Sequence, residues 1–252
     1  MLVQPLLDKL GSLKLAGMRE GLREQMENTA YRKLSFEERF GLLLDKEWSL
    51  RQTRKQTRRV RMARFREDAA IEDFDFSGSR GLERSQVLAL AEDDWIRRRL
   101  NAIITGPTGA GKTFLACALG RSACRNGVSV RYFPLSKLLQ KITRARVDGS
   151  WPKFLDTLTK IQLLVIDDWL RNPLTESQTP DLLEILEDRY GRASTLLATQ
   201  IPVADWHDRL GNATLADAVM DRIIHNAYRL DLQGESMRKR RSPLTHSGHK
   251  DV

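Results

Sequence analysis

Eight consecutive residues of the chain, Gly106 to Thr113, have the types and the spacing for phosphate chemistry. Their sequence, GPTGAGKT, fits the pattern G-x-x-x-x-G-K-[ST]. Its glycines let backbone N–H groups surround an anion, and a helix that begins after them adds further unpaired N–H groups. In such a loop the lysine reaches the β- and γ-phosphates of a nucleotide, and the Thr hydroxyl ligates Mg²⁺. We therefore expect a site for ATP and Mg²⁺, with Lys112 acting on the phosphates, Thr113 on the metal, and the nucleotide held by Gly106, Pro107, Thr108, Gly109, Ala110, Gly111, Lys112, Thr113 and Phe114.

Two consecutive acids, Asp167 and Asp168, supply the second half of this chemistry. They follow the apolar run LLVI, which predicts a buried strand, and open parallel sheets bind ligands where their strands end. Asp167 is the candidate Mg²⁺ ligand, and Asp168 is placed to polarise an attacking water molecule. The second acid favours a hydrolase over a nucleotide kinase, because it has a role only if water is activated.

The elements that must position these residues follow from the alternation of apolar runs with amphipathic helices beyond residue 100. This alternation is typical of a parallel sheet covered by helices on both faces. The predicted fold class is α/β, with a five-stranded parallel sheet flanked by helices. The predicted strands are 101–105, 128–133, 161–167, 194–199 and 227–233, and the predicted helices are 111–125, 135–158, 177–190 and 214–226.

The first 70 residues predict a small domain made only of helices. Ser35 and Glu38 have the spacing of a capping box, which would open a long helix. The acidic and glycine-rich segment 67–84 predicts the boundary that follows, so that the domains are 1–70, 71–238 and a basic, mobile tail over 239–252. The expected apolar side of the long helix consists of Phe40, Leu43, Leu44, Glu47, Trp48 and Leu50.

Positive charge is concentrated in one segment of the chain. The net charge is +9, and residues 51–66 contain eight Arg or Lys and no acid. Two interpretations stay open: a solvated helix paired with acids elsewhere, or contact with the phosphate backbone of a nucleic acid, with affinity from counterion release. The candidate DNA contacts in this segment are Arg51, Arg54, Lys55, Arg58, Arg59 and Arg61.

The remaining composition favours a reduced, cytoplasmic protein without a membrane partner. No apolar run approaches the roughly 20 residues of a membrane span, and no secretory signal is visible at the N-terminus. The only cysteines, Cys117 and Cys124, lie too far apart along one predicted helix to form a disulfide.

Several segments together resemble the IstB-type ATP-binding proteins encoded by insertion sequences. They are GPTGAGKT, LLVIDDW, the stretch from LLATQIP to GESMR over residues 196–238, and LSFEERFGLLLDKEW near the N-terminus. Members of this family are AAA+ ATPases related to the DnaC helicase loaders. The resemblance covers about residues 5–240 and implies an AAA+ core, binding of duplex DNA, ATP-dependent homo-oligomers, and action beside an IstA-type transposase in target selection and transposition.

The resemblance also implies roles for individual residues. Gln200, with Thr199 before it, matches the residue that senses the γ-phosphate, although many relatives have Asn there. Arg222 matches an arginine finger that reaches a neighbouring subunit's nucleotide, and Arg238 matches a second sensor arginine. In this clade an inserted helix between the second and third strands contacts DNA, which makes Lys137, Lys141, Arg144 and Arg146 candidates.

Three other functions remain open from the residues alone. A helicase loader of the same clade would use its N-terminal region to hold a helicase. A small-molecule kinase would act as a monomer without DNA. A DNA-binding scaffold would use the nucleotide only to change shape, with negligible turnover.

Overall fold

The computed structural model describes residues 3–76 and 81–234, which fall into two compact units. Unit 1 comprises residues 1–58 and unit 2 comprises residues 59–252. The division lies inside helix α3 (Phe36–Ala63), before the boundary expected at residue 70. Ala63 and Ala69 are buried in the core of the α/β unit, which is why the end of α3 belongs with it.

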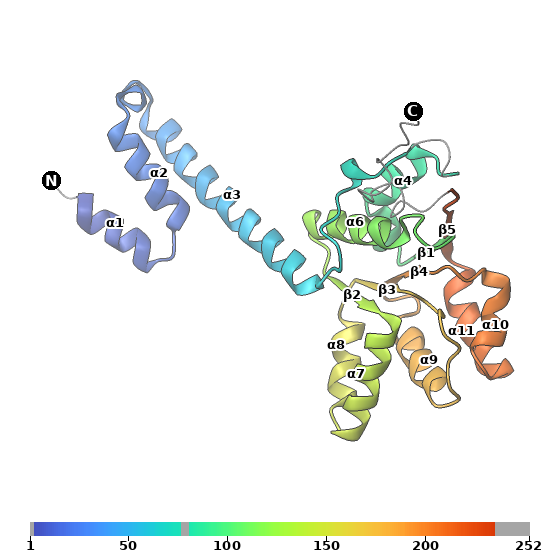
Figure 1. Cartoon of the computed structure of the whole chain (residues 1–252). Helices are drawn as coiled ribbons and strands as arrows, with labels where there is room; N and C mark the ends of the chain where they lie inside the picture. The colour runs from blue at the N-terminus through green and yellow to red at the C-terminus, as the bar shows by residue number, and fades with distance from the viewer. Residues whose placement is uncertain (1–2, 77–80, 235–252) are drawn as a thin grey trace, which may run out of the picture. The chain divides into compact units, whose positions relative to one another are not determined.

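Unit 1 consists of helices, as predicted. It contains α1 (Val3–Ser12), α2 (Ala16–Glu27), a 3₁₀ turn η1 (Thr29–Lys33) and the first part of α3 (Figure 1). The predicted capping box is confirmed: the N–H of Ser35 donates to Glu38 Oε2 at 2.7 Å, and the N–H of Glu38 donates to Ser35 Oγ at 3.2 Å. The sequence therefore specifies where α3 begins.

The prediction of an apolar side on α3 is wrong, because Phe40 and Leu44 are exposed and Glu47 is buried with its carboxylate hydrogen-bonded. Its Oε2 accepts hydrogen bonds from the N–H groups of Gly17 at 2.7 Å and Met18 at 3.3 Å, so it caps the start of α2. A Cβ on Gly17 would lie 2.6 Å from Glu47 Cα, so the two backbones approach as only glycine allows. Trp48, in contrast, is 65% exposed.

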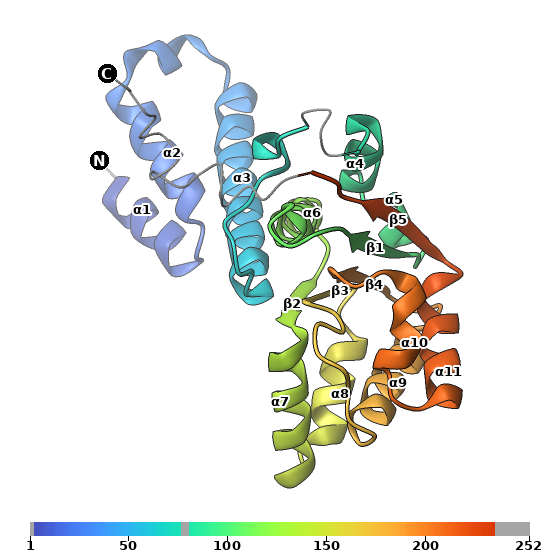
Figure 2. The ribbon, with the colours of Figure 1, turned by 45° about the vertical axis from the view of Figure 1, so that its right-hand side comes forward.

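Unit 2 is built on a five-stranded sheet in which every neighbouring pair of strands is parallel. The strand order is β2-β3-β4-β1-β5 (Figure 2), and all five predicted strands are confirmed with small shifts at their ends. The central strands β3 and β4 are buried along their whole length because helices cover both faces. The strands are β1 (Asn101–Thr105), β2 (Val130–Pro134), β3 (Leu163–Asp167), β4 (Ser194–Ala198) and β5 (Ala227–Asp231).

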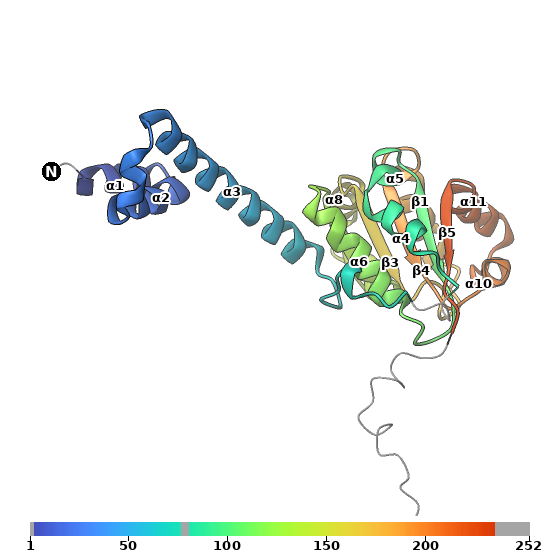
Figure 3. The same ribbon diagram turned by 90° about the horizontal axis from the view of Figure 1, so that it is seen from above.

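Helices cover both faces of this sheet (Figure 2), and one hydrophobic cluster on each face fixes them to it. The first face carries α6 (Lys112–Arg125), α4 (Arg84–Ala91), α5 (Asp94–Arg97) and the segment 63–76, which includes a 3₁₀ turn η2 (Ile71–Asp73). The other face carries α7 (Leu135–Val147), α8 (Trp151–Thr159), α9 (Gln178–Arg189), α10 (Trp206–Arg209) and α11 (Ala213–Ile224), which leads directly into β5 (Figure 3).

The helices differ from the prediction in one break and in three additional helices. The single helix predicted over 135–158 is two helices, α7 and α8, separated at Gly149, where φ is +74°. Helices α4, α5 and α10 were not predicted; α5 and α10 have only four residues each. No helix among the described residues has the length and apolar character needed to cross a membrane.

Candidate nucleotide-binding site

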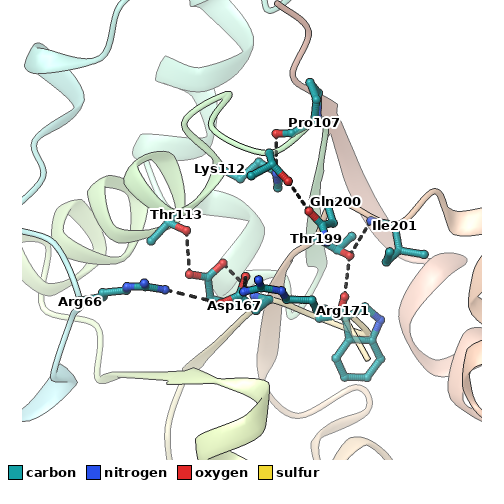
Figure 4. A network of polar contacts seen from close by, with 12 residues as sticks. Arg66, Pro107, Lys112, Thr113, Asp167, Arg171, Thr199, Gln200 and Ile201 are labelled. Carbon is teal, nitrogen blue, oxygen red and sulfur yellow. Dashed lines mark hydrogen bonds and ion pairs between the residues drawn. The ribbon is translucent and has the colours of Figure 1, made fainter. Parts of the chain in front are cut away.

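The loop predicted to hold phosphates lies between β1 and α6, as its sequence context requires. Gly106 has φ +141°, and a Cβ there would lie 2.2 Å from the carbonyl oxygen of Leu232, so no other residue fits. Gly111 caps α6 with φ +100°, and α6 begins at Lys112. Lys112 Nζ donates to the carbonyl oxygen of Pro107 at 2.8 Å (Figure 4). This hydrogen bond thus links the first residue of α6 to the phosphate loop.

Asp167, a residue that is 2% exposed, lies at the end of β3 with three donors around its carboxylate. Thr113 Oγ1 donates to Asp167 Oδ2 at 2.8 Å, and the Tyr132 hydroxyl donates to the same oxygen at 2.6 Å. The N–H of Asp168 donates to Asp167 Oδ1 at 2.9 Å. Burial and the neighbouring Asp167 raise the pKa of Tyr132 above its usual range, so its hydroxyl keeps the proton that it donates. The two predicted metal ligands, Thr113 and Asp167, therefore lie together (Figure 4).

Asp168 directs its carboxylate toward two arginines that no motif marks. Its backbone is left-handed, with φ +54°, and its side chain is 38% exposed. Arg66 NH1 lies 3.5 Å from Asp168 Oδ2, and Arg171 NH1 lies 4.0 Å from Asp168 Oδ1 (Figure 4). The predicted water-activating acid is thus held between cations from two separate segments.

These residues meet at a cavity of about 450 Å³. Among the predicted nucleotide ligands, Gly106 shapes the loop beside the cavity, Pro107 accepts the Lys112 bond, and Ala110 is buried. The wall also includes Arg66 from the basic segment and Glu67, Asp73, Phe74 and Asp75 from the predicted domain boundary, none of which was predicted to lie at the nucleotide site. The predicted residues that line the cavity are Thr108, Gly109, Gly111, Lys112, Thr113, Phe114, Asp167, Asp168, Thr199 and Gln200.

The two residues at the expected γ-phosphate sensor position differ in what they can do. The Thr199 hydroxyl donates to the Trp169 carbonyl oxygen at 2.6 Å and accepts from the N–H of Ile201 at 3.0 Å. It is buried and engaged within the fold. Gln200 is exposed at the cavity, where its Oε1 accepts a hydrogen bond from the Thr108 hydroxyl of the phosphate loop. Gln200 is therefore the residue of the pair whose side chain contacts the phosphate loop.

Arg222 lies outside the residues that line this cavity. It is on α11, where its NH2 lies 3.2 Å from Glu187 Oε1 and its NH1 lies 3.5 Å from Asp221 Oδ2. The structure therefore does not bring Arg222 to the nucleotide site of its own chain. Arg238 lies outside the described residues.

Nine of the ten candidate DNA contacts are exposed, and two of these nine form ion pairs within the fold. Arg51 Nε lies 2.6 Å from Glu47 Oε1, so it supports the cap of α2. Arg146 NH2 lies 2.7 Å from carboxylate oxygens of both Asp181 and Glu184. Arg59 is half-buried, and the other exposed candidates are Arg54, Lys55, Arg58, Arg61, Lys137, Lys141 and Arg144.

One further cation, Arg131 of β2, contacts the end of α3. Its NH1 donates to the carbonyl oxygen of Met62 at 2.5 Å. Arg131 and Lys141 both lie over the ring of Phe133, at 5.5 and 5.7 Å from its centroid. Burial and Arg64 lower the pKa of Arg131; burial, Arg131, Arg64 and Arg144 lower the pKa of Lys141. The mutual repulsion of these four cations would be relieved by a polyanion.

Comparison with known proteins agrees with this geometry. The family model of the IstB-like ATP binding protein matches residues 8–245. The chain is 47% identical over 239 residues to the putative insertion sequence ATP-binding protein y4pL of Sinorhizobium fredii, covering 95% of this chain and 98% of that protein. It is 31% identical over 229 residues to the putative ATP-binding protein of the insertion sequence IS21 of Pseudomonas aeruginosa, covering 91% and 86%.

Solved structures share the fold of unit 2. A crystal structure of the DnaC helicase loader has a TM-score of 0.57 at 20% identity and covers 66% of this chain and 97% of that chain. The replication initiator DnaA bound to AMPPCP and single-stranded DNA has a TM-score of 0.56 at 19% identity and covers 68% and 52%. These neighbours confirm the predicted α/β fold. With the family match over nearly its whole length, the chain belongs to the family of IstB-like ATP-binding proteins.

Proposed function

We propose that this protein is a DNA-binding ATPase that assembles on duplex DNA with ATP and assists an insertion-sequence transposase of the IstA type in target selection and transposition. The observation that carries the proposal is the meeting of the phosphate loop with Asp167 and Asp168 at one cavity, where Thr113 Oγ1 lies 2.8 Å from Asp167 Oδ2. The cavity volume is within the range of about 300–1,000 Å³ that is usual for small-molecule sites.

The residues present fit both ATP and Mg²⁺. The loop offers backbone N–H groups and the start of α6 to the phosphates, and Lys112 lies on the loop within reach of them. Thr113 and Asp167 offer adjacent oxygen donors, which Mg²⁺ prefers, and they would hold the metal between them. Bound there, Mg²⁺ would neutralise charge on the β- and γ-phosphates.

Hydrolysis would use Asp168 as the acceptor of a proton from water while that water attacks the γ-phosphorus and ADP leaves. Gln200 would sense the γ-phosphate from its place beside the phosphate loop, where it contacts Thr108. Arg222 would act on the nucleotide of a neighbouring subunit, which is consistent with its place away from the cavity of its own chain. A guanidinium there would stabilise the charge that develops during transfer.

Binding to DNA would rest on positive charge rather than on base-specific contacts. The exposed cations of α3 and the cluster of Arg64, Arg131, Lys141 and Arg144 offer contacts to phosphates, which give affinity that is largely independent of sequence. The names of the relatives place those proteins in insertion sequences, which supports transposition as the setting.

Sedimentation of the purified protein tests this proposal under four conditions: with and without ATP·Mg²⁺, each with and without random duplex DNA. We expect large oligomers only when both are present. A monomer that ignores DNA under all four conditions would refute the proposal and favour a small-molecule kinase. Assembly that requires a replicative helicase in place of duplex DNA would favour a helicase loader.

A further inference from the structure

Arg66 follows the end of α3 by three residues, yet its guanidinium lies at the nucleotide cavity. Its NH1 is 3.5 Å from Asp168 Oδ2, while Arg171 NH1 is 4.0 Å from the other oxygen, Oδ1. Each oxygen of the proposed water-activating carboxylate therefore faces one guanidinium. Figure 4 shows Arg66 reaching the acids from the opposite side to Arg171.

The backbone that carries Arg66 is anchored on the element that forms the phosphate site. The neighbouring Phe65 packs so closely on α6 that a Cβ on Gly120 would lie 2.6 Å from its Cε1 atom. The Phe65 ring also lies 6.4 Å, centroid to centroid, from the ring of Tyr132, whose hydroxyl holds Asp167. The packing of Phe65 therefore holds the backbone from which the Arg66 side chain extends.

The carboxylate of Asp168 needs such a contact. Its N–H is fixed by Asp167 Oδ1, but its side chain is 38% exposed, so nothing in a buried core restricts its rotamer. Arg171 is three residues further along the same segment and 65% exposed, and its guanidinium is the more distant one. Of the two cations, Arg66 is thus the one with both the shorter contact and the anchored backbone.

We propose that Arg66 is a positioning residue that holds the carboxylate of Asp168 toward the attacking water. The inference rests on the proposed ATPase function and adds a residue that no motif marks. Misplacement of a reacting group by about 1 Å can reduce a rate about 100-fold, whereas a partly exposed ion pair adds little to stability. Loss of Arg66 should therefore reduce turnover and leave folding and ATP binding intact.

The test compares kcat and KM for ATP in the full-length wild type, Arg66→Ala and Arg66→Lys, by phosphate release at saturating Mg²⁺. The matched control is Arg98→Ala, because Arg98 forms a similar exposed ion pair with Asp94 at 3.8 Å and does not line the cavity. We expect Arg66→Ala to lower kcat at least about tenfold with KM nearly unchanged. Arg66→Lys should recover part of kcat, and Arg98→Ala should match the wild type.

A double variant identifies the residue through which Arg66 acts. If Arg66 works through Asp168, Asp168→Asn combined with Arg66→Ala should be no slower than Asp168→Asn alone. A further multiplicative loss, or a raised KM at unchanged kcat, would show that Arg66 acts elsewhere and would overturn the inference. A wild type without any hydrolysis would refute the proposed function as well, whereas normal hydrolysis in both wild type and Arg66→Ala would refute the inference alone.

Discussion

Substitution of Tyr132 by Phe isolates one hydrogen bond at the centre of the candidate site. The Tyr132 hydroxyl donates to Asp167 Oδ2 at 2.6 Å, and both side chains are almost fully buried. Phenylalanine keeps the ring and its packing against Phe65, so the change creates no large cavity. The variant therefore removes the hydroxyl, with its bond to Asp167 and its interaction with Arg66, and keeps the packing of the ring.

The expected magnitude follows from the charge on the acceptor. A hydrogen bond to a charged group contributes about 1.5–3 kcal/mol, and Asp167 would keep only the donors from Thr113 and Asp168. We expect the free energy of unfolding of unit 2 to fall by that amount, which corresponds to a Tm lower by about 3–12 °C for a unit of this size. Because the folded-state pKa of Tyr132 is raised above its usual value near 10, the contribution should be constant between about pH 6 and 9 and should be lost only at more alkaline pH.

Urea unfolding followed by tryptophan fluorescence measures this difference, since Trp169 and Trp206 are fully buried in unit 2. Tyr190→Phe is the matched control, because Tyr190 is 52% exposed and should tolerate the change. A loss for Tyr132→Phe below about 0.5 kcal/mol, equal to that of the control, would refute the reasoning that Tyr132 holds Asp167.

Three further variants test other parts of the structure. Gly106→Ala should destabilise unit 2 by about 2–4 kcal/mol and abolish ATP binding. Gly41→Ala is the control and should not destabilise unit 1, because a Cβ there meets nothing within 4 Å. Thermal unfolding with and without ATP compares the two variants, and equal effects would contradict the loop geometry. Glu47→Gln should destabilise unit 1 at neutral pH. Burial opposes the charge, but hydrogen bonds from Arg51, Gly17 and Met18 lower the pKa of Glu47. The stabilisation by Glu47 is therefore present above the usual pKa near 4.3 and is lost as the pH falls through the lowered value. Unfolding followed by circular dichroism should show the stabilities of the wild type and the variant converging in acid. Replacing Arg54, Arg58 and Arg61 by Ala in one variant should weaken duplex DNA binding and reduce the slope of log affinity against log salt concentration by about two to three. An unchanged slope in a binding titration would assign α3 to a protein partner.

The parts of the site that the sequence predicts are those encoded locally. The phosphate loop and the two acids are read from adjacent residues, and the strands that carry them have apolar runs long enough to be recognised. The short helices α5 and α10 contain only four residues each, which is too few for a helical period to show. The break between α7 and α8 had a local signal in Gly149, but the amphipathic pattern on both sides of it concealed the break.

The parts that the sequence does not predict reach the site through tertiary packing. Arg66 approaches Asp168 because Phe65 packs on Gly120 of α6, and nothing near Arg66 in the sequence indicates this. Tyr132 lay within a predicted strand, but its role depends on the pairing of β2 with β3, which places its hydroxyl beside Asp167. Glu47 was assigned to an apolar helix face because its partner, the start of α2, is 30 residues away in sequence.

The most direct test of the central claim is ATP binding and turnover measured side by side in the wild type, Lys112→Ala and Asp168→Asn. Calorimetric titration with ATP·Mg²⁺ gives the affinity, and phosphate release gives the rate. The structure predicts that Lys112→Ala loses binding, whereas Asp168→Asn binds ATP with affinity near that of the wild type and hydrolyses it at least about 100-fold more slowly. Normal turnover by Asp168→Asn, or unchanged ATP affinity in Lys112→Ala, would contradict the assignment of this cavity as the ATPase site.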